Sequence, residues 1–571
     1  MKQVVSIGTQ SFEFLRKNNY FFVDKTDFIK EWWENGDAVT LITRPRRFGK
    51  TLNLDMLKCF FSNQYLKKDN LFRGLSVWKD EKYRKLQGSY PVIFISFSDI
   101  KGAAYQDARD GIIATLAETY RDHNYLLQGN LLSDTEKQFF NSLEEYSKYP
   151  QRKNPVTDTT IIRALKDLSY FLSRQYGKKV LIFLDEYDTP LQEAYTNGYW
   201  NELTPLIRGL FNSTFKTNPY LERAMLTGIT RVSKESIFSD MNNLEVVTTT
   251  SNKYSTSFGF TEAEVIGSLK LMGVESRMEQ IKYWYDGFKF GKQPDIYNPW
   301  SITKFLDSGE LGTYWADTSS NKLASDLIQQ GTPQLKMSME DLLAGKVLET
   351  ELDEQVIFEQ LPKKRGAIWS LLLAAGYLNV INRDFDDQTG KYTYHLKITN
   401  HETMLMFEDM IENWFSADDT SYSNFKDALL QGDLDYMNQF LSQIALKTFS
   451  SFDTGNKPSR QAEPERFYHG FVLGLIVDLA DRYHITSNRE SGFGRYDVMM
   501  LPKNASDNAF ILEFKVFNPR KEKDLTETVQ NALEQIRKKK YNSGLTANGI
   551  PEDRIIHYGF AFKGKEVLIG S

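Results

Sequence analysis

Cysteine is nearly absent from this chain, and neither sign of charge dominates it. Because Cys59 is the only cysteine, an internal disulfide framework and a cysteine-rich zinc site are excluded. The 70 basic and 75 acidic residues leave a net charge of −5. No global positive field therefore indicates nucleic-acid binding, and any such binding must depend on local clusters.

Long hydrophobic runs are also missing. No apolar run approaches the roughly 20 residues of a membrane span, and Met1–Ser6 lacks the apolar segment of a signal peptide. We therefore expect a cytoplasmic protein with no membrane partner. Core-forming residues are plentiful, since 41% of the 571 residues are hydrophobic and 14% are aromatic. This composition excludes a disordered or collagen-like polymer and predicts roughly three or four folded units.

The first two-fifths of the chain alternates short apolar strands with helices, which is the pattern of an α/β fold with a parallel sheet. The predicted buried strands are Ala38–Thr43, Pro91–Phe97, Lys179–Asp185 and Arg223–Ile229. Apolar spacing predicts helices at Leu52–Phe61 and Thr159–Tyr176. From about residue 261 helical patterns take over, at Glu262–Met272, Ile368–Leu378 and Met404–Phe415.

A polar stretch with glycine and proline, Ser450–Pro464, is typical of a linker. Beyond it the pattern predicts a compact α-β-β-β-α-β unit. Its expected elements are a helix at Glu465–Tyr483, strands at His484–Arg489, Arg495–Leu501 and Ala509–Phe517, a helix at Leu525–Lys540 and a strand near Ile555–Phe562. We therefore divide the chain into an α/β domain (1–260), a mostly helical lid or linker region (261–455) and a second α/β domain (456–571).

The segment Arg44–Thr51 lies between a predicted strand and a predicted helix, the context that a phosphate-binding loop requires. Backbone N–H groups would surround the phosphates of a nucleotide, Lys50 would add a positive charge, and the Thr51 hydroxyl would bind Mg²⁺. The predicted nucleotide-binding residues are Arg46, Arg47, Phe48, Gly49, Lys50 and Thr51. Arg44 replaces the first glycine of the usual pattern, but the four cations Arg44, Arg46, Arg47 and Lys50 together suit a polyanion. The alternative is a basic surface turn before an amphipathic helix.

Two acids, Asp185 and Glu186, end an apolar strand, at the edge where open parallel sheets bind ligands. In P-loop ATPases the first acid holds Mg²⁺ through water and the second polarises the attacking water. We therefore predict Asp185 in the nucleotide and Mg²⁺ site and Glu186 as a catalytic residue. The next strand would supply a polar sensor, Thr227 or Thr230, and the phosphate-facing Arg231. The alternative is an ordinary strand that runs into a solvated acidic turn.

A second cluster lies near the end of the chain. Glu513 and Lys515 share one strand face because side chains alternate, and Asp497 lies 513 − 497 = 16 residues earlier, which suits a neighbouring strand. Two close carboxylates need a cation, and hard oxygen ligands select Mg²⁺ or Mn²⁺. The predicted metal ligands are Asp497, Glu513 and Glu465, and the predicted catalytic residues are Asp497, Glu513 and Lys515. The lysine would orient or deprotonate the attacking water in phosphodiester hydrolysis.

The alternative for Glu513 and Lys515 is an ordinary pair on a half-exposed strand. Gln535 and Tyr541, on or just past the later helix, are expected to approach the cluster. The basic run Arg537–Lys540 suits a nucleic-acid backbone, although a solvated helix end is the commoner meaning of such a run.

Several motifs resemble those of the AAA-ATPase-like family of bacterial P-loop ATPases. They are Ser6–Gly8, Asn19–Thr26, Arg44–Thr51, Leu184–Asp188, Thr227–Gly228, Tyr285–Phe288 and Tyr297–Ser301. The C-terminal motifs resemble the PD-(D/E)XK nuclease superfamily, at Tyr468–Phe471, Ser487–Asp497 and Glu513–Lys515. The resemblance implies a P-loop NTPase parallel sheet, a helical middle region and a C-terminal α/β domain of the restriction-endonuclease type.

The resemblance and the two sites imply an ATP-binding and ATP-hydrolysing protein coupled to a Mg²⁺-dependent nuclease that acts on DNA or RNA. A second hypothesis is a nucleotide-dependent interaction protein, whose C-terminal domain binds nucleic acid or a partner without cutting. The acidic net charge and the lack of a long basic stripe accord with this second hypothesis. A third option is an ATPase whose C-terminal domain has only a structural role. The sequence leaves the oligomeric state open.

Overall fold

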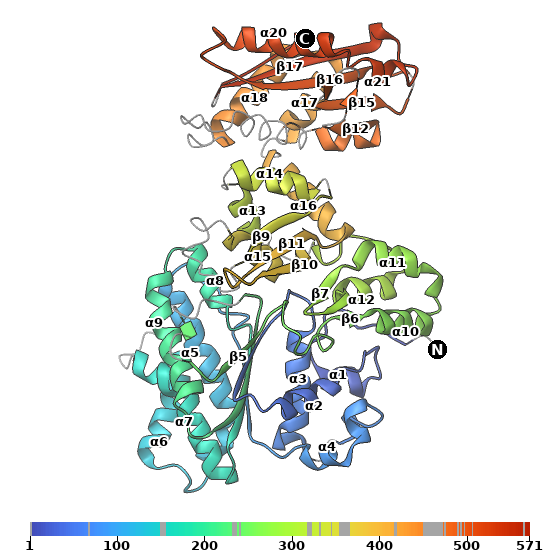
Figure 1. The fold of residues 1–571 in the computed structure, drawn as a ribbon. Helices are drawn as coiled ribbons and strands as arrows, with labels where there is room; N and C mark the ends of the chain where they lie inside the picture. The colour runs from blue at the N-terminus through green and yellow to red at the C-terminus, as the bar shows by residue number, and fades with distance from the viewer. Residues whose placement is uncertain are drawn as a thin grey trace. The chain divides into compact units, whose positions relative to one another are not determined.

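The computed structural model forms two units (Figure 1). The first comprises residues 1–320 and 348–404, and the second comprises residues 321–347 and 405–571. The residues that the structure describes are 3–66, 69–148, 156–230, 237–238, 241–316, 322–329, 333–343, 345–352, 366–415, 419–448, 472, 476–487, 490–491, 494–495, 497–504, 506–563 and 566–571. None of the helices in these ranges combines the length and the apolar composition that crossing a membrane requires.

The first unit is built on a five-stranded parallel sheet with the strand order β2-β3-β4-β1-β5. Its strands are β1 (Val39–Thr43), β2 (Val92–Ser96), β3 (Val180–Asp185), β4 (Leu221–Gly228) and β5 (Leu244–Val247). Strands β1 and β3 are buried along their whole length, as expected for a parallel sheet covered on both faces. The four predicted strands are confirmed to within about two residues, and β5 is an addition.

Helices cover both faces of this sheet. Figure 1 shows α5 (Tyr105–Arg121), α7 (Asp158–Tyr176) and α9 (Trp200–Phe211) on one side of the sheet, with α2 (Asp27–Asn35) and α3 (Lys50–Phe61) on the other. Helix α7 begins where the Thr157 side chain accepts a hydrogen bond from the Thr160 N–H, and it ends at Gly177 in the left-handed conformation. The other helices of this region are α1 (Phe12–Lys17), α4 (Glu81–Leu86), α6 (Asp134–Lys148) and α8 (Thr189–Thr196).

The part of the first unit beyond residue 260 contains helices, as predicted, together with two small antiparallel sheets that the sequence pattern did not reveal. One sheet has the order β6-β8-β7 and the other β10-β11-β9. Their strands are β6 (Phe260–Thr261), β7 (Phe288–Phe290), β8 (Gln293–Tyr297), β9 (Leu348–Glu351), β10 (Leu378–Asp386) and β11 (Lys391–Ile398). The helices are α10 (Glu262–Met272), α11 (Met278–Tyr285), α12 (Pro299–Ser308) and α15 (Ala367–Ala375), and α16 (His401–Phe415) begins in this unit. The predicted helix Ile368–Leu378 is wrong at its end, because Gly376 adopts a left-handed conformation and Leu378 already starts β10.

The second unit contains a five-stranded mixed sheet of the order β12-β15-β16-β17-β18. Its strands are β12 (Tyr483–Ser487), β15 (Val498–Pro502), β16 (Ala509–Val516), β17 (Ile555–Lys563) and β18 (Glu566–Gly570). Strand β16 pairs antiparallel with β15 and parallel with β17, and α20 (Leu525–Lys539) connects β16 to β17. These elements confirm most of the predicted unit and add β18. The other helices of this unit are α13 (Lys322–Gln329), α14 (Pro333–Leu343), α17 (Asp419–Gln431), α18 (Leu434–Thr448) and α21 (Ser543–Thr546).

Strand β16 is buried on both faces. Phe510, Leu512 and Phe514 pack in one hydrophobic cluster with residues of α17 and α18. On the opposite face, Ile511 packs with residues of α20. The linker Ser450–Pro464 and most of the predicted helix Glu465–Tyr483 lie outside the described residues, and the described end of that helix is a 3₁₀ turn, Val477–Asp481, after which Tyr483 already starts β12.

Candidate functional site

The loop between β1 and α3 has the backbone shape that an anion site needs. Arg47 and Gly49 adopt left-handed conformations, with φ of 65° and 79°. Gly49 precedes the first residue of α3, and no side chain caps that helix start. The first backbone N–H groups of α3 therefore have no capping partner in the helix itself and suit a phosphate.

Lys50 is buried at this helix start, with 6% of its surface exposed. Its ammonium group donates to the backbone carbonyls of Arg44 (3.0 Å) and Pro45 (2.8 Å), which belong to the loop itself. Burial lowers the pKa of Lys50, and the carboxylates of Glu186 and Asp185 oppose this shift. The lysine therefore sits inside the loop and near both predicted acids.

Thr51 and Asp185 are 134 residues apart in sequence, and the sheet brings them together. The Thr51 hydroxyl donates to Asp185 Oδ2 at 2.6 Å, and Asp185 is 1% exposed. The Thr227 hydroxyl, at the end of β4, donates to the other carboxylate oxygen of Asp185. A hydroxyl beside a carboxylate at the end of a parallel sheet is a donor set that fits Mg²⁺ on a nucleotide.

Glu186 follows Asp185 in a left-handed conformation with φ of 50°, which is uncommon for a residue with a side chain. Burial raises the pKa of Glu186, while Lys50 counteracts the rise. The Thr189 hydroxyl donates to Glu186 Oε2 at 3.3 Å. Glu186 is thus a half-buried acid held next to the loop. Arg231, the predicted phosphate-facing cation, lies outside the described residues.

Asp188 was not predicted as a site residue, although the motif Leu184–Asp188 contains it. Its Oδ2 accepts the backbone N–H groups of Ile229 (3.0 Å) and Thr230 (2.9 Å) and the Thr230 hydroxyl (2.8 Å). Gly228 permits this approach, because a Cβ there would lie 2.6 Å from Asp188 Oδ1. Asp188 therefore fixes the end of β4 beside the two acids.

Arg44 corrects one prediction, because it is not among the cations that face a polyanion. Its side chain is fully buried. The guanidinium donates to the backbone carbonyls of Thr43 (2.9 Å) and Thr248 (2.6 Å) and lies 4.4 Å from the centre of the Phe290 ring. Burial lowers the pKa of Arg44 to about 9. Arg44 replaces the first glycine of the usual loop as an anchor that ties the loop to the segment after β5.

Arg46 and Arg47 are exposed at the tip of the loop, whereas Phe48 is buried. The Arg47 guanidinium lies 4.5 Å from the centre of the Trp300 ring. The Phe48 ring packs against Phe288, with 4.8 Å between ring centres. Phe48 can therefore contribute to a phosphate site through its backbone N–H, while its ring holds the loop in place.

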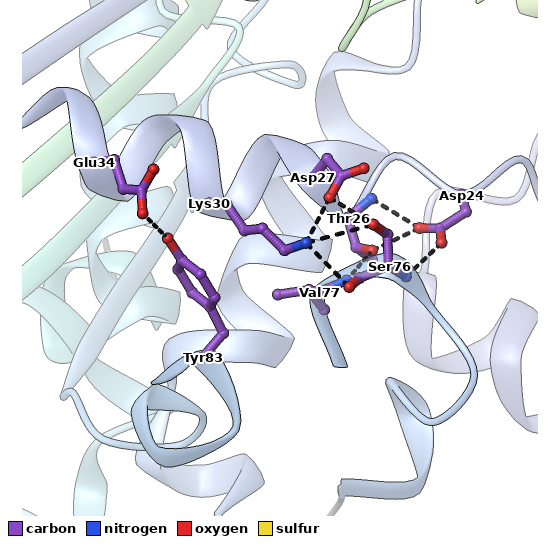
Figure 2. Close-up of polar contacts among 8 residues, drawn as sticks. All are labelled: Asp24, Thr26, Asp27, Lys30, Glu34, Ser76, Val77 and Tyr83. Carbon is purple, nitrogen blue, oxygen red and sulfur yellow. Dashed lines mark hydrogen bonds and ion pairs between the residues drawn. The ribbon is translucent and has the colours of Figure 1, made fainter. Parts of the chain in front are cut away.

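Two residues of the motif Asn19–Thr26, Asp24 and Thr26, by contrast make structural hydrogen bonds (Figure 2). Asp24 accepts hydrogen bonds from the Thr26 N–H (2.9 Å) and hydroxyl (2.6 Å) and from the Ser76 N–H (2.7 Å). The Thr26 hydroxyl in turn accepts the Val77 N–H at 3.1 Å. These hydrogen bonds connect the start of α2 to the segment that precedes α4. Both carboxylate oxygens of Asp24 take part in them, so we assign Asp24 a structural role.

Three carboxylates, those of Glu262, Asp286 and Asp295, surround Lys282 near the motif Tyr285–Phe288. Lys282 pairs with Glu262 at 2.5 Å and lies 3.8 Å from carboxylate oxygens of both Asp286 and Asp295. Burial raises the pKa of Asp286 to about 6, the nearby Asp295 adds to the rise, and the Gly287 N–H opposes it. Since Lys282 lies within 4 Å of all three carboxylates, we interpret the cluster as part of the packing, in which Asp286 bears an unfavourable charge above about pH 6.

Asp286→Asn should stabilise the protein at pH 8 and leave it unchanged near pH 4. The folded state binds the Asp286 proton more tightly than the unfolded chain. Below about pH 4 the acid is largely protonated in both states and behaves like asparagine, and stability is lost as the pH rises through about 6, where the folded state must ionise it. Asparagine never ionises, which gives an expected gain on the order of 2 kcal/mol above pH 7. Thermal unfolding between pH 4 and 8 measures the effect. The exposed Asp307→Asn is the control, and an equal gain at both pH values would contradict the assignment.

In the second unit, Asp497 and Glu513 lie at the same end of the antiparallel ladder between β15 and β16. The last pair of this ladder is Val498 with Leu512; Asp497 directly precedes Val498, and Glu513 directly follows Leu512. Asp497 Oδ2 also accepts the Phe514 N–H at 2.8 Å, which fixes the aspartate at the end of its strand. The structure thus brings both predicted acids together.

Glu513 is 1% exposed, on the face of β16 that α20 covers. The amide of Gln535 on α20 donates to Glu513 Oε1 and also to the Tyr541 hydroxyl, at 3.3 Å for the latter. Lys515 lies 3.8 Å from Glu513 Oε1 and is partly exposed. Glu513 is therefore buried rather than half-exposed, while the Glu513–Lys515 pair that the alternative describes is present.

Two carboxylates beside a lysine fit a divalent cation by the chemistry of their oxygen atoms. The described residues contain no group of three or more histidine, cysteine, aspartate or glutamate side chains arranged around a metal position. The third predicted ligand, Glu465, lies outside the described residues. Asp497 and Glu513 are accordingly the two described candidates for metal ligands at this site.

Comparison with known proteins matches both ends of the chain. Residues 6–238 match a family model described as "Predicted AAA-ATPase", and residues 463–571 match the PD-(D/E)XK nuclease superfamily. Over 566 residues the chain is 27% identical to the "Uncharacterized protein in vnfD 5'region" of Azotobacter chroococcum mcd 1, covering 96% of this chain and 95% of that protein. The resemblance inferred from the motifs is confirmed: the chain carries an AAA-ATPase-like domain at residues 6–238 and a PD-(D/E)XK nuclease superfamily domain at residues 463–571.

Proposed function

We propose that this protein binds and hydrolyses ATP at the loop Arg44–Thr51 and cleaves DNA or RNA with Mg²⁺ or Mn²⁺ at Asp497, Glu513 and Lys515. The observation that carries the nucleotide half is the Thr51–Asp185 hydrogen bond beside the buried Lys50. The nuclease half is supported by Asp497, which accepts the N–H of Phe514 and so lies beside Glu513. Both halves agree with the domains matched at the two ends of the chain.

In the nucleotide site, the N–H groups of residues 46–51 would bind the phosphates, and Lys50 would turn from the loop carbonyls to the ligand. Thr51 and Asp185 would hold Mg²⁺, which neutralises phosphate charge when bound. Glu186 would orient the attacking water and receive its proton, a role to which its raised pKa is suited because a stronger base accepts a proton more readily.

In the nuclease site, Asp497 and Glu513 would hold the divalent cation, which stabilises the developing charge on the phosphate. Lys515 would orient the attacking water. Gln535 keeps the Glu513 carboxylate in place through its amide, so it is a positioning residue. The exposed run Arg537–Lys540, at the end of the same helix, would contact the nucleic-acid backbone.

A second candidate function is nucleotide-dependent binding of nucleic acid or a partner without cleavage. The ion pair between Lys515 and Glu513 favours it, because the lysine already supplies a positive charge to this carboxylate. In that case Lys515 would balance the charge of Glu513 and no metal would be needed.

Three further predictions from the sequence stay predictions. They are the division of the chain at residues 260 and 455, the role of the middle region as a lid or linker, and a cytoplasmic location.

The decisive experiment incubates the full chain with plasmid DNA, linear DNA and RNA, each with and without Mg²⁺ and ATP, and measures strand cleavage, phosphate release and the binding of both ATP and nucleic acid. We expect Mg²⁺-dependent cleavage of at least one substrate and ATP hydrolysis that also depends on Mg²⁺. Binding of nucleic acid without any cleavage would contradict the nuclease half and select the second candidate. Absence of ATP binding would contradict the nucleotide half.

A further inference from the structure

The backbone of the loop tip is held by two buried side chains from beyond residue 260. The carbonyl of Arg46 accepts hydrogen bonds from the indole N–H of Trp315 (3.1 Å) and from the Asn298 amide (3.4 Å). Trp315 is 2% exposed and Asn298 is 1% exposed. A movement of the Arg46 carbonyl would therefore break these hydrogen bonds or displace both donors.

A buried carboxylate, Glu402, connects these two donors. Its Oε1 accepts the backbone N–H of Trp315 at 2.5 Å, and its Oε2 accepts the Ser301 hydroxyl at 2.9 Å. Ser301 belongs to α12, the helix that Asn298 caps through hydrogen bonds from the N–H groups of Trp300 and Ser301. Both routes from the loop, through Trp315 and through Asn298 with α12, thus converge on Glu402, which is 1% exposed.

Glu402 is the second residue of α16, whose start is firmly anchored in the first unit. The Asn400 side chain accepts the Thr403 N–H at 3.0 Å. The chain just before the helix packs against Gly287, where a Cβ would lie 1.9 Å from the carbonyl oxygen of Thr399. The helix has 15 residues, so it is about 22 Å long, and from Leu405 onward it belongs to the second unit.

We propose that Glu402 couples the nucleotide state of the loop to α16 and through this helix to the second unit. The inference rests on the proposed nucleotide site. Phosphates that bind the N–H groups of residues 46–51 would change the orientation of the Arg46 carbonyl. The free energy of keeping the bonds to Trp315 and Asn298 then differs between the empty and the occupied loop. Such a difference is what coupling between distant sites requires.

The test is hydrogen–deuterium exchange of the full chain with Mg²⁺ and a non-hydrolysable ATP analogue, compared with Mg²⁺ alone. We expect slower exchange in residues 44–58 and at least a 5-fold change in exchange rate in residues 405–415, in line with the usual size of coupling between sites. Glu402→Gln should abolish the change in residues 405–415 and keep the response in residues 44–58. If Glu402→Gln does not fold, Trp315→Phe, which removes the indole N–H but keeps the backbone N–H, should at least halve the change in residues 405–415, because only the route through Asn298 then remains.

The exposed Glu310→Gln, in the same unit, is the matched control and should retain both responses. If residues 44–58 respond and residues 405–415 do not, the coupling is wrong while the nucleotide site stands. If residues 405–415 respond as strongly in Glu402→Gln as in the control Glu310→Gln, the route through Glu402 is wrong. If residues 44–58 of the unmodified chain do not respond, the nucleotide site itself fails and the coupling fails with it.

Discussion

Replacing Lys50 with methionine should weaken the binding of ATP with Mg²⁺ at least about 100-fold. A hydrogen bond to a charged group contributes about 1.5–3 kcal/mol, and Lys50 would make such bonds to the phosphates. Methionine preserves most of the apolar stem of a side chain that is only 6% exposed, so the loop should still fold. Isothermal titration calorimetry measures the affinity, and thermal unfolding verifies that the variant is folded.

Lys58→Met is the matched control for this experiment. Lys58 lies on the same helix α3, but its ammonium group pairs with Asp55 at 2.6 Å instead of pointing into the loop. We expect this variant to bind ATP with the affinity of the unmodified chain. If a folded Lys50→Met variant keeps its affinity, the loop Arg44–Thr51 does not bind the nucleotide.

The parallel sheet was predictable because its strands are nearly continuous apolar runs bounded by turn residues. Strand β3 is such a run, and it is buried over its full length. The small sheets after residue 260 were missed because their strands carry mixed residues. In β10, for example, all residues after Val380 except Ile381 and Phe385 are polar or charged, and the strand is exposed there. Polar side chains pair across these strands, as His395 of β11 does with Asp384 of β10. A sequence of such residues resembles that of a loop.

The role of Arg44 shows a second limit. Its basic neighbours, Arg46 and Arg47, suggest a basic surface, yet Arg44 is fully buried while Arg46 and Arg47 are exposed. The backbone carbonyls that satisfy the Arg44 guanidinium come from Thr43 and from Thr248, about 200 residues further along. No local pattern encodes that encounter, so a cation count along the loop overestimates the positive charge available to a ligand.

The residues of the candidate sites also fall into two groups, those that the sequence could associate and those that it could not. Spacing along neighbouring strands was sufficient to associate Asp497 with Glu513, because antiparallel pairing of consecutive strands is a local event. Trp315 and Glu402 could not be found in this way. They are single residues without a motif. Trp315 contacts the Arg46 carbonyl, and Glu402 contacts Trp315, only after the segments following residue 260 have folded.

Glu513→Gln and Lys515→Met should each lower metal-dependent cleavage of nucleic acid at least about 1,000-fold, as measured by initial rates on the substrate that the full chain cuts. Glutamine removes the negative charge that a divalent cation requires, and methionine removes the group that orients the attacking water. Affinity of Glu513→Gln for uncut nucleic acid should change less than about 3-fold, since one buried carboxylate contributes little to backbone binding. Glu534→Gln on α20 and Lys563→Met on β17 are the matched controls, because both residues are exposed at the surface of the same unit. If either site variant folds and still cuts at the full rate, its residue has no part in catalysis. If both variants do so, the phosphodiester chemistry lies elsewhere in the chain.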